Sequence, residues 1–266
     1  MAIKTAKIET LEYLVADGIG VSHCFTTRLG GVSVGSLASL NISHHRGDAP
    51  GNVEQNYRIL AKALGFTVDQ LVLSHQIHSD IIRKVEKQDH LGLDHHVYPE
   101  CDALITKDPG TALAIFTADC TPILLWDAHN GAVGAIHAGW RGTAQNIAGK
   151  TVEKMVAELG CRAEHIHAAI GPNIGSCCFE AGAEVAQAML ATFGEPAQTW
   201  IRPVGEKFYL DLKKINALAL QNAGVRYIEI STDCTMCQPM RFWSHRVHGP
   251  SRGSQGAIIV CGEGML

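Results

Sequence analysis

A cysteine and a histidine flank the turn of a predicted hairpin near the middle of the sequence. Residues 123–126 and 132–136 form short apolar runs of strand length, and Asn130-Gly131 between them is a strong turn signal. The midpoint of positions 120 and 137 falls inside this turn, so Cys120 and His137 are predicted to face each other across an antiparallel pair. A thiol and an imidazole held this close are either two metal ligands or a nucleophile and its base.

Polar neighbours favour a functional role for this pair. A single cysteine or histidine in an apolar strand is more often an inert core residue or a satisfied buried group. Here Asp119 directly precedes the thiol, where it could act as an acid/base or orient a ligand, and His137 opens a Gly-Trp-Arg-Gly turn that leads into a helix. We therefore interpret Cys120 and His137 as a functional pair.

A metal site would need a third ligand, and the segment Ser74-His75-Gln76-Ile77-His78-Ser79 offers two imidazoles. Spacing alone does not choose between His75 and His78. Two histidines and one cysteine would leave an open position on a tetrahedral Zn²⁺ ion, which is the arrangement of a catalytic site, because a structural zinc takes four protein ligands. The helix after Arg141 could add an anion site at the same end of the hairpin, although a solvated arginine is an equally good interpretation.

The predicted elements that position these residues alternate irregularly between helix and strand. One helix runs through residues 54–61, with Asn52 as its cap and Gly65 as its stop, and a second starts after Arg141-Gly142 and ends at Gly160. Two others cover about 183–193 and 212–223, the last closed by Gly224. Apolar runs predict further strands at 71–73, 81–82, 112–116, 166–170 and 257–260. With no repeat or linker, the pattern indicates a single mixed α+β domain over residues 1–266.

Composition narrows the class of protein. The chain has 266 residues, 22 Lys and Arg against 26 Asp and Glu, nine Cys and 14 His. Its formal charge of −4 gives no electrostatic reason to expect a nucleic-acid partner, and it has no apolar run suited to a membrane span. The polar N-terminus lacks a secretory signal, so we expect a cytoplasmic protein whose cysteines are core residues, metal ligands or nucleophiles rather than a disulfide framework.

Several ordered motifs resemble the laccase-domain family, whose members are called multicopper polyphenol oxidases, purine nucleoside phosphorylases or peptidoglycan editing factor. The resemblance covers nearly the whole chain. The motifs that carry it are Thr27-Arg28-Leu29-Gly30-Gly31-Val32-Ser33, Ser39-Leu40-Asn41, Gly47-Asp48, Gln76-Ile77-His78, Thr117-Ala118-Asp119-Cys120-Thr121-Pro122, His137-Ala138-Gly139-Trp140-Arg141-Gly142, Ile170-Gly171-Pro172-Asn173-Ile174-Gly175-Ser176-Cys177-Cys178-Phe179-Glu180, Leu210-Asp211-Leu212 and Arg241-Phe242-Trp243-Ser244-His245-Arg246.

The resemblance implies a fold and a site. The implied fold is α+β, with mixed β-sheets packed together and flanked by helices in a single Cys–His hydrolase-like domain, related to bacterial toxins that use a Cys–His pair for deamidation. The implied zinc ligands are His78, Cys120 and His137, so the family pattern chooses His78 over His75. Family positions also suggest Arg28, Asn41 and Arg58, together with Arg141, as substrate or phosphate contacts. The chain departs from many members at His245 and at Val247-His248, which puts substrate contacts there in doubt.

The sequence indicates no function for the remaining groups of cysteines and histidines. Cys234 and Cys237 form a CxxC pair without a second CxxC, so a zinc ribbon is disfavoured and a packing role is preferred over a redox dithiol. Adjacent cysteines seldom bridge each other, so Cys177-Cys178 is interpreted as tight packing near the site. The histidines at 90, 95 and 96 fall in a polar stretch and are assigned no role.

The leading functional hypothesis is a zinc-dependent purine nucleoside enzyme. Following the resemblance, it would phosphorolyse adenosine, inosine, guanosine and methylthioadenosine and would deaminate adenosine. A second hypothesis is an amidohydrolase that removes misincorporated L-Ser from peptidoglycan precursors. Copper-dependent polyphenol oxidation is disfavoured, because multinuclear copper centres need many paired histidines, although soft ligands can bind copper. The last alternative is a metal-stabilised module without catalysis.

Overall fold

Two β-sheets lie face to face in the computed structural model, which describes residues 2–90, 92–93 and 98–262. Histidines 95 and 96 lie outside this part of the chain. The first sheet has six strands in the spatial order β1 (Ile3–Ile8), β2 (Leu11–Ala16), β3 (His23–Thr26), β15 (Gln255–Val260), β7 (Ala112–Thr117) and β4 (Leu71–Val72). The second sheet has six in the order β14 (Tyr227–Ile230), β10 (Ile166–Ile170), β8 (Thr121–Asp127), β9 (Val133–Ala138), β6 (Ala103–Thr106) and β5 (Ile82–Lys84).

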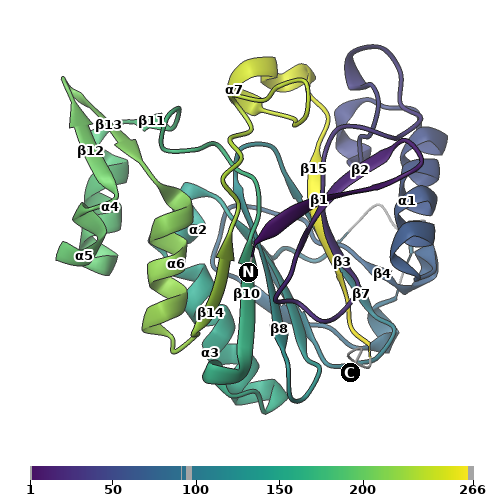
Figure 1. Ribbon diagram of the computed structural model, residues 1–266, viewed down its shortest axis with the longest axis horizontal. Coiled ribbons are helices and arrows are strands. Elements are labelled where there is room, and N and C mark those ends of the chain that lie inside the picture. The colour runs from purple at the N-terminus through teal and green to yellow at the C-terminus, as the bar shows by residue number, and fades with distance from the viewer. Residues whose placement is uncertain (1, 91, 94–97, 263–266) are drawn as a thin grey trace.

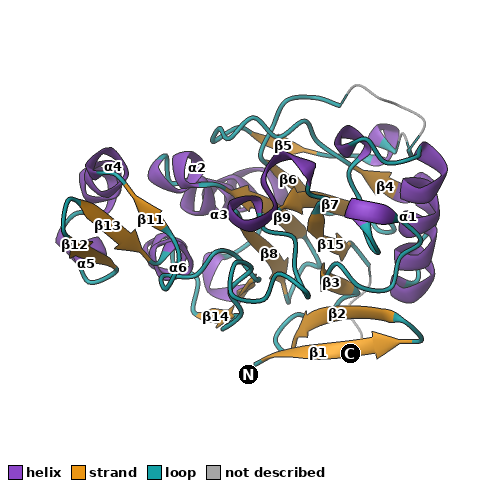
Figure 2. Cartoon of the chain, turned by 90° about the horizontal axis from the view of Figure 1, so that it is seen from above, coloured by secondary structure: helices purple, strands orange, loops and turns teal. Residues whose placement is uncertain are grey.

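Helices cover the outer faces of both sheets (Figures 1 and 2). Helix α1 packs on the first sheet, and α3 and α6 pack on the second. A small sheet of β11 (Glu180–Ala181), β13 (Lys207–Leu210) and β12 (Ile201–Val204) extends from the α6 side with two further helices. The helices are α1 (Pro50–Leu64), α2 (Trp140–Ala144), α3 (Ile147–Leu159), α4 (Ala183–Phe193), α5 (Glu195–Gln198), α6 (Leu212–Asn222) and α7 (His245–His248).

Strand alternation explains the layers. In β7, Leu113 and Ile115 belong to the apolar cluster between the sheets, whereas Ala112 and Ala114 belong to the cluster under α1. In β8, Leu124 faces the space between the sheets. Because successive side chains of a strand point to opposite faces, each fully buried strand joins two apolar layers. The expected mixed α+β arrangement of packed sheets flanked by helices is confirmed.

The central hairpin is present, but its predicted register is wrong. His137 pairs with Pro122, and Thr121 pairs with Ala138. Cys120 therefore lies just before the first residue of β8 and not opposite His137. The turn is centred one residue later than expected. The Asp127 carboxylate accepts hydrogen bonds from the backbone N–H groups of residues 129 and 130, which shapes a loop over residues 128–131.

Two helix predictions also need correction. The segment after the Gly-Trp-Arg-Gly turn is not one helix, because Asn146 takes a left-handed conformation (φ 61°) between α2 and α3. Helix α1 begins at Pro50 rather than after Asn52, consistent with the preference of proline for the first helical turn. Strands β1, β2, β3, β6 and β14 and the small sheet were not among the predicted elements. No helix in the described ranges is both long enough and apolar enough to cross a membrane.

Candidate metal and substrate site

Three side chains predicted as metal ligands lie together at one end of the central hairpin. The ligand atoms of His78, Cys120 and His137 are all within 4.8 Å of one another. His78 Nε2 lies 3.8 Å from Cys120 Sγ, and the rings of His78 and His137 meet edge to face at 4.9 Å. The structure thus brings together residues that are far apart in sequence, on three different segments.

The backbone takes unusual conformations in two segments of the site, at His78 and at Asp119 beside Cys120. His78 has a φ of 62° and Asp119 a φ of 87°, in the left-handed region that residues other than glycine rarely adopt. The sharp bend at Asp119 turns Cys120 toward His137 just before β8 begins. Gln76 holds the His78 loop to β7, because its side-chain amide donates to the Phe116 carbonyl at 2.8 Å and accepts from the Phe116 N–H at 2.6 Å.

A buried aspartate supports two of the three candidate ligands. Asp102 Oδ1 lies 2.8 Å from Nδ1 of His137 and accepts a hydrogen bond from the backbone N–H of His78 at 3.0 Å. Its Oδ2 accepts two bonds from Ser79 at 2.7 Å, one from the N–H and one from the hydroxyl. Burial raises the pKa of Asp102, but these bonds outweigh burial and hold the pKa at about 2. The carboxylate therefore fixes the His137 ring with Nε2 toward the cluster.

Asp102 was not among the predicted site residues. It stands alone before an apolar strand, and nothing in its spacing connects it with His137, which lies 35 residues further along the chain. A general chemical signal was available, since a metal-binding histidine almost always donates its second ring nitrogen to a carboxylate or a carbonyl.

The thiol and the imidazole shift each other's titration. Burial raises the pKa of Cys120, but the charge of His137 and hydrogen bonds from His137 and His78 reverse this and lower the pKa to about 6. Burial lowers the pKa of His137, but the Cys120 thiolate and Asp102 reverse this and raise the pKa to about 9. Near neutral pH the ion-free pair is therefore a thiolate beside an imidazolium.

The donor set fits zinc. Zinc binds thiolate and imidazole at about 2.3 and 2.0–2.1 Å, and tetrahedral geometry then separates the two donors by about 3.6 Å. The 3.8 Å between His78 Nε2 and Cys120 Sγ is close to this value. Asp102 supplies the carboxylate that zinc-binding histidines commonly carry on their other nitrogen. Two imidazoles and one thiolate would leave a coordination position free.

The side chain of Asp119 is hydrogen-bonded to two other segments of the chain next to Cys120. Its side chain is buried; Oδ1 accepts a 2.6 Å hydrogen bond from the Thr235 hydroxyl, and Oδ2 accepts a 2.8 Å bond from the Arg246 N–H. Both carboxylate oxygens are therefore engaged by neighbouring segments. This geometry favours the orienting role over proton transfer, the two roles that the sequence left open.

A pocket of about 280 Å³ opens above His78, Cys120 and His137. Half-buried Arg46 and Arg252 line it, and neither was a predicted site residue. Burial and the neighbouring Arg46 lower the pKa of Arg252 to about 10, so it stays charged at neutral pH. Within the described part of the chain, the buried Nε of Arg46 has no hydrogen-bond partner. Two guanidinium groups beside the cluster suit an anionic substrate group.

The four residues expected to contact substrate or phosphate lie elsewhere than in this pocket lining. Arg28 stacks on Trp243 at 3.8 Å and donates to the Ala38 and Pro239 carbonyls. Arg141 is exposed and stacks on Trp140, and Arg58 pairs with Glu54 on the exposed face of α1. Buried Asn41 accepts hydrogen bonds from the N–H groups of two pocket residues, Ser43 and Ser254. Direct contact of these four residues with substrate stays a prediction.

The family model and the relatives of known sequence point to the same protein family. Residues 22–262 match the family described as multi-copper polyphenol oxidoreductase laccase. A relative from Deinococcus radiodurans named purine nucleoside phosphorylase is 40% identical over 250 residues, covering 94% of this chain and 92% of that protein. Purine nucleoside phosphorylase YlmD from Geobacillus stearothermophilus is 38% identical, covering 88% of this chain and 87% of its own length.

Solved structures agree with the sequence comparison. The crystal structure of YlmD from Geobacillus stearothermophilus aligns with a TM-score of 0.90 at 34% identity, over 97% of this chain and 99% of that one. The Bacillus licheniformis hypothetical protein YfiH aligns with a TM-score of 0.89 at 30% identity, over 96% and 97%. Some relatives of this chain are named purine nucleoside phosphorylase. Sequence and fold both show that the chain belongs to the multi-copper polyphenol oxidoreductase laccase family.

Proposed function

We propose that the protein is a zinc-dependent purine nucleoside phosphorylase acting on adenosine, inosine, guanosine and methylthioadenosine. One observation carries the proposal: the His78–Cys120–His137 cluster lies in a pocket that also presents the guanidinium groups of Arg46 and Arg252. Zinc held by these three ligands would supply Lewis-acid polarisation at its free position. The printed names of the relatives support the same class of reaction.

In this reaction a phosphate oxygen attacks C1′ of the ribose and the bond from C1′ to the purine nitrogen breaks. The bonding electron pair leaves with the base, which takes up a proton. We assign Arg46 and Arg252 to hold the phosphate, because guanidinium forks match phosphate oxygens. Phe116 and Tyr98 line the same pocket with planar rings against which a purine can pack. The pocket imidazoles of His45 and His75 are the candidates to protonate the leaving base.

The proposal includes deamination of adenosine, in which water replaces the 6-amino group and ammonia leaves. It also places the protein in the cytoplasm, with small molecules and not nucleic acid as its partners, in keeping with the formal charge of −4. In the proposed enzyme Asp102 orients His137, and Asp119 orients the segment that carries Cys120.

The deciding assay is chromatography of purified protein incubated with adenosine or inosine, with and without phosphate. We expect free purine base and ribose 1-phosphate in a phosphate-dependent reaction, and inosine from adenosine without phosphate. Removal of zinc with a chelator, followed by its return, should abolish and restore both activities. Full turnover by metal-free protein would contradict the proposal, and loss of only one activity would contradict a shared site.

A second candidate is amide hydrolysis with Cys120 as the nucleophile. A specific observation favours it: Cys120, His137 and Asp102 form a thiol–imidazole–carboxylate array with a lowered thiol pKa. The thiolate would attack the amide carbonyl, the amine would leave with a proton from His137, and water would release the acid. A precursor muropeptide carrying L-Ser is the test substrate, and this route requires activity in metal-free protein, because a zinc-bound thiolate is not free to attack.

The two other interpretations make different predictions. Copper-dependent phenol oxidation requires oxygen consumption with a phenolic substrate and a copper-loaded protein. Among the described residues, the His-containing cluster has three ligands, which is fewer than a multinuclear copper centre needs. A non-catalytic metal-stabilised module predicts that Cys120→Ala unfolds the protein, whereas an enzyme predicts a folded but inactive variant.

A further inference from the structure

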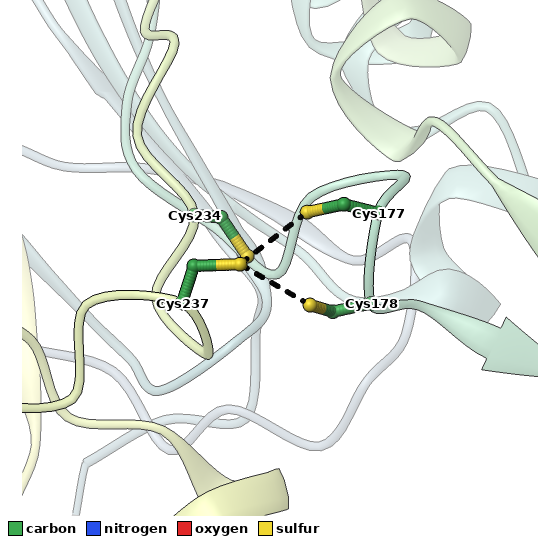
Figure 3. Close-up of side chains that lie close together, drawn as sticks. All are labelled: Cys177, Cys178, Cys234 and Cys237. Atoms are coloured by element: carbon green, nitrogen blue, oxygen red, sulfur yellow. Dashed lines mark hydrogen bonds between the residues drawn. The ribbon is translucent and has the colours of Figure 1, made fainter.

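Four cysteine side chains converge at a second place in the molecule (Figure 3). Cys177 and Cys178 lie on the loop after β10, and Cys234 and Cys237 lie on the loop after β14. All four Sγ atoms are within 4.8 Å of one another, and Cys237 Sγ lies 3.6 Å from that of Cys177 and 3.4 Å from that of Cys178. The two pairs were predicted to be separate packing residues, and 60 positions separate Cys177 from Cys237.

We propose that these four thiolates bind a structural zinc ion, distinct from the ion proposed at His78, Cys120 and His137. A tetrahedral ion with zinc–sulfur bonds of about 2.3 Å separates its sulfurs by about 3.8 Å. The observed separations of 3.4 and 3.6 Å are close to that value. Four sulfur ligands would fill the coordination sphere, so this ion would have no open position for substrate.

Two features of the surroundings suit a thiolate at Cys234. The N–H of Gly175 donates a 3.2 Å hydrogen bond to Sγ of Cys234. A Cβ at position 175 would lie 3.2 Å from Cβ of Cys234 and 3.3 Å from Sγ of Cys177, so this position has little room for a side chain. Buried Lys213 donates to the Asp233 carbonyl at 2.8 Å and interacts electrostatically with Cys234 and Cys177. Its ammonium group would offset part of the negative charge of a zinc bound to four thiolates.

A disulfide explains this arrangement less well. The bond requires sulfurs about 2.05 Å apart, and the Sγ of Cys237 lies almost equally far from those of Cys177 and Cys178. One disulfide would leave two sulfurs unpaired, and two disulfides would sort the sulfurs into two bonded pairs, whereas Cys237 Sγ lies near the sulfurs of two different cysteines. Convergence of all four sulfurs on one point is the geometry that a single tetrahedral ion requires.

The proposed ion would brace the cysteine of the first site. Between Cys234 and Cys237, Thr235 donates from its N–H to the Asn173 carbonyl at 2.9 Å and from its hydroxyl to Asp119 at 2.6 Å. The N–H of Ile174 donates to the Asp119 carbonyl at 3.0 Å. Both cysteine loops thus contact Asp119, the residue before Cys120. Zinc joining the loops would hold this segment in place without touching substrate.

Metal analysis of reduced full-length protein, purified without added metal, tests the proposal. We expect two zinc ions per chain in the wild type and one each in His78→Ala, Cys178→Ser and Cys237→Ser. The control Cys261→Ala removes a buried thiol outside both clusters and should keep two. Cobalt added to metal-free His78→Ala protein should give the sulfur-to-metal charge-transfer band and strong visible absorption of a four-thiolate tetrahedral site, and chelation of this variant should lower its Tm.

Other outcomes separate the two sites. One zinc in wild type that persists in His78→Ala but is lost in Cys178→Ser would support the four-cysteine site and contradict the zinc-dependent function. One zinc that is lost in His78→Ala and kept in Cys178→Ser would overturn the present proposal. A disulfide among the four cysteines, detected by mass spectrometry of unreduced peptides, or iron in place of zinc, would overturn it too. If the cysteine variants fail to fold, the cobalt spectrum of His78→Ala decides the question.

Discussion

The imidazole of His137 is held by the carboxylate of Asp102, with Nδ1 and Oδ1 2.8 Å apart and both side chains buried. The same carboxylate accepts hydrogen bonds from the backbone N–H groups of Ile77, His78 and Ser79. One side chain therefore positions a ligand on β9 and the loop that presents a second ligand. The geometry of the candidate zinc site therefore depends on this aspartate as well as on the three ligands.

The first prediction concerns Asp102→Asn. An amide oxygen in place of Oδ1 keeps an acceptor for His137, but the NH₂ group in place of Oδ2 then faces the N–H donors of Ile77 and Ser79, so the ring and the loop cannot both be satisfied. We expect zinc affinity to fall about 10–100-fold, measured by chelator competition. The control is Asp80→Asn, a nearby partly exposed aspartate that pairs with Lys150. Equal affinity in both variants would show that Asp102 does not support the site.

The second prediction concerns pH and the metal-free thiol. Because the pKa of Cys120 is lowered to about 6, its thiolate predominates above that pH and is lost below it. The rate of alkylation of Cys120 should therefore rise through pH 6 and level off near neutrality, followed by mass spectrometry of the modified peptide. The alkylation rate of an ordinary cysteine rises through about pH 8.5 instead.

His137→Ala provides the matched test for this titration. It removes the cation that stabilises the thiolate, so the alkylation midpoint should move upward by more than one pH unit. An unchanged midpoint would mean that the imidazole does not set the reactivity of Cys120.

The third prediction concerns Gly139, where the chain leaves β9. A Cβ there would lie 2.7 Å from Cδ2 of His78 and 3.4 Å from Sγ of Cys120. Its backbone is extended (φ −69°, ψ 169°), a conformation that any residue adopts, so Gly139→Ala carries a steric cost at His78 and no backbone cost. We expect a folded variant with lower zinc affinity and lower activity.

The control for this variant is Gly51→Ala. Gly51 lies on α1, and a Cβ there meets nothing within 4 Å. Alanine should leave zinc binding unchanged and stabilise the helix by about 0.5–1 kcal/mol, measured as the free energy of unfolding. Normal zinc binding by Gly139→Ala would contradict the close packing around His78.

The sequence was informative wherever local periodicity and punctuation agree. Glycines mark the helix ends at 65, 160 and 224, and β10 spans the predicted residues 166–170. Strand β1 was missed because it is largely exposed and charged, which hides the apolar alternation. Strands β2 and β3 are almost entirely buried, and their buried polar residues Glu12 and His23 interrupt the apolar runs that would have marked them. The predicted hairpin centre was wrong by one residue, because the Asp127 carboxylate accepts hydrogen bonds from the N–H groups of His129 and Asn130 and shapes a loop over residues 128–131 that the sequence pattern did not indicate.

The candidate site divides in the same way. Cys120 and His137 are joined by one hairpin, so local reasoning could connect them, whereas the choice of His78 needed a family resemblance. Asp102, Arg46 and Arg252 come from separate segments that only the packing of two sheets brings together. The four-cysteine cluster has the same cause, since β10 and β14 are neighbouring parallel strands whose following loops meet at one edge. Sequence spacing cannot show such contacts.

The last prediction separates the arginines that the sequence and the pocket indicate. Arg252 is half-buried in the pocket, whereas Arg141 is exposed and stacked on Trp140. A charge-assisted hydrogen bond to phosphate is worth about 1.5–3 kcal/mol, so Arg252→Gln should raise the KM for phosphate about 10–100-fold in the phosphorolysis assay. Arg141→Gln should leave it within about twofold, because an exposed side chain contributes little. The reverse result would assign phosphate to the first turn of α2, the end of the hairpin that the sequence first suggested. Zinc content should be unchanged in both variants, so that the difference reports phosphate binding and not loss of the metal.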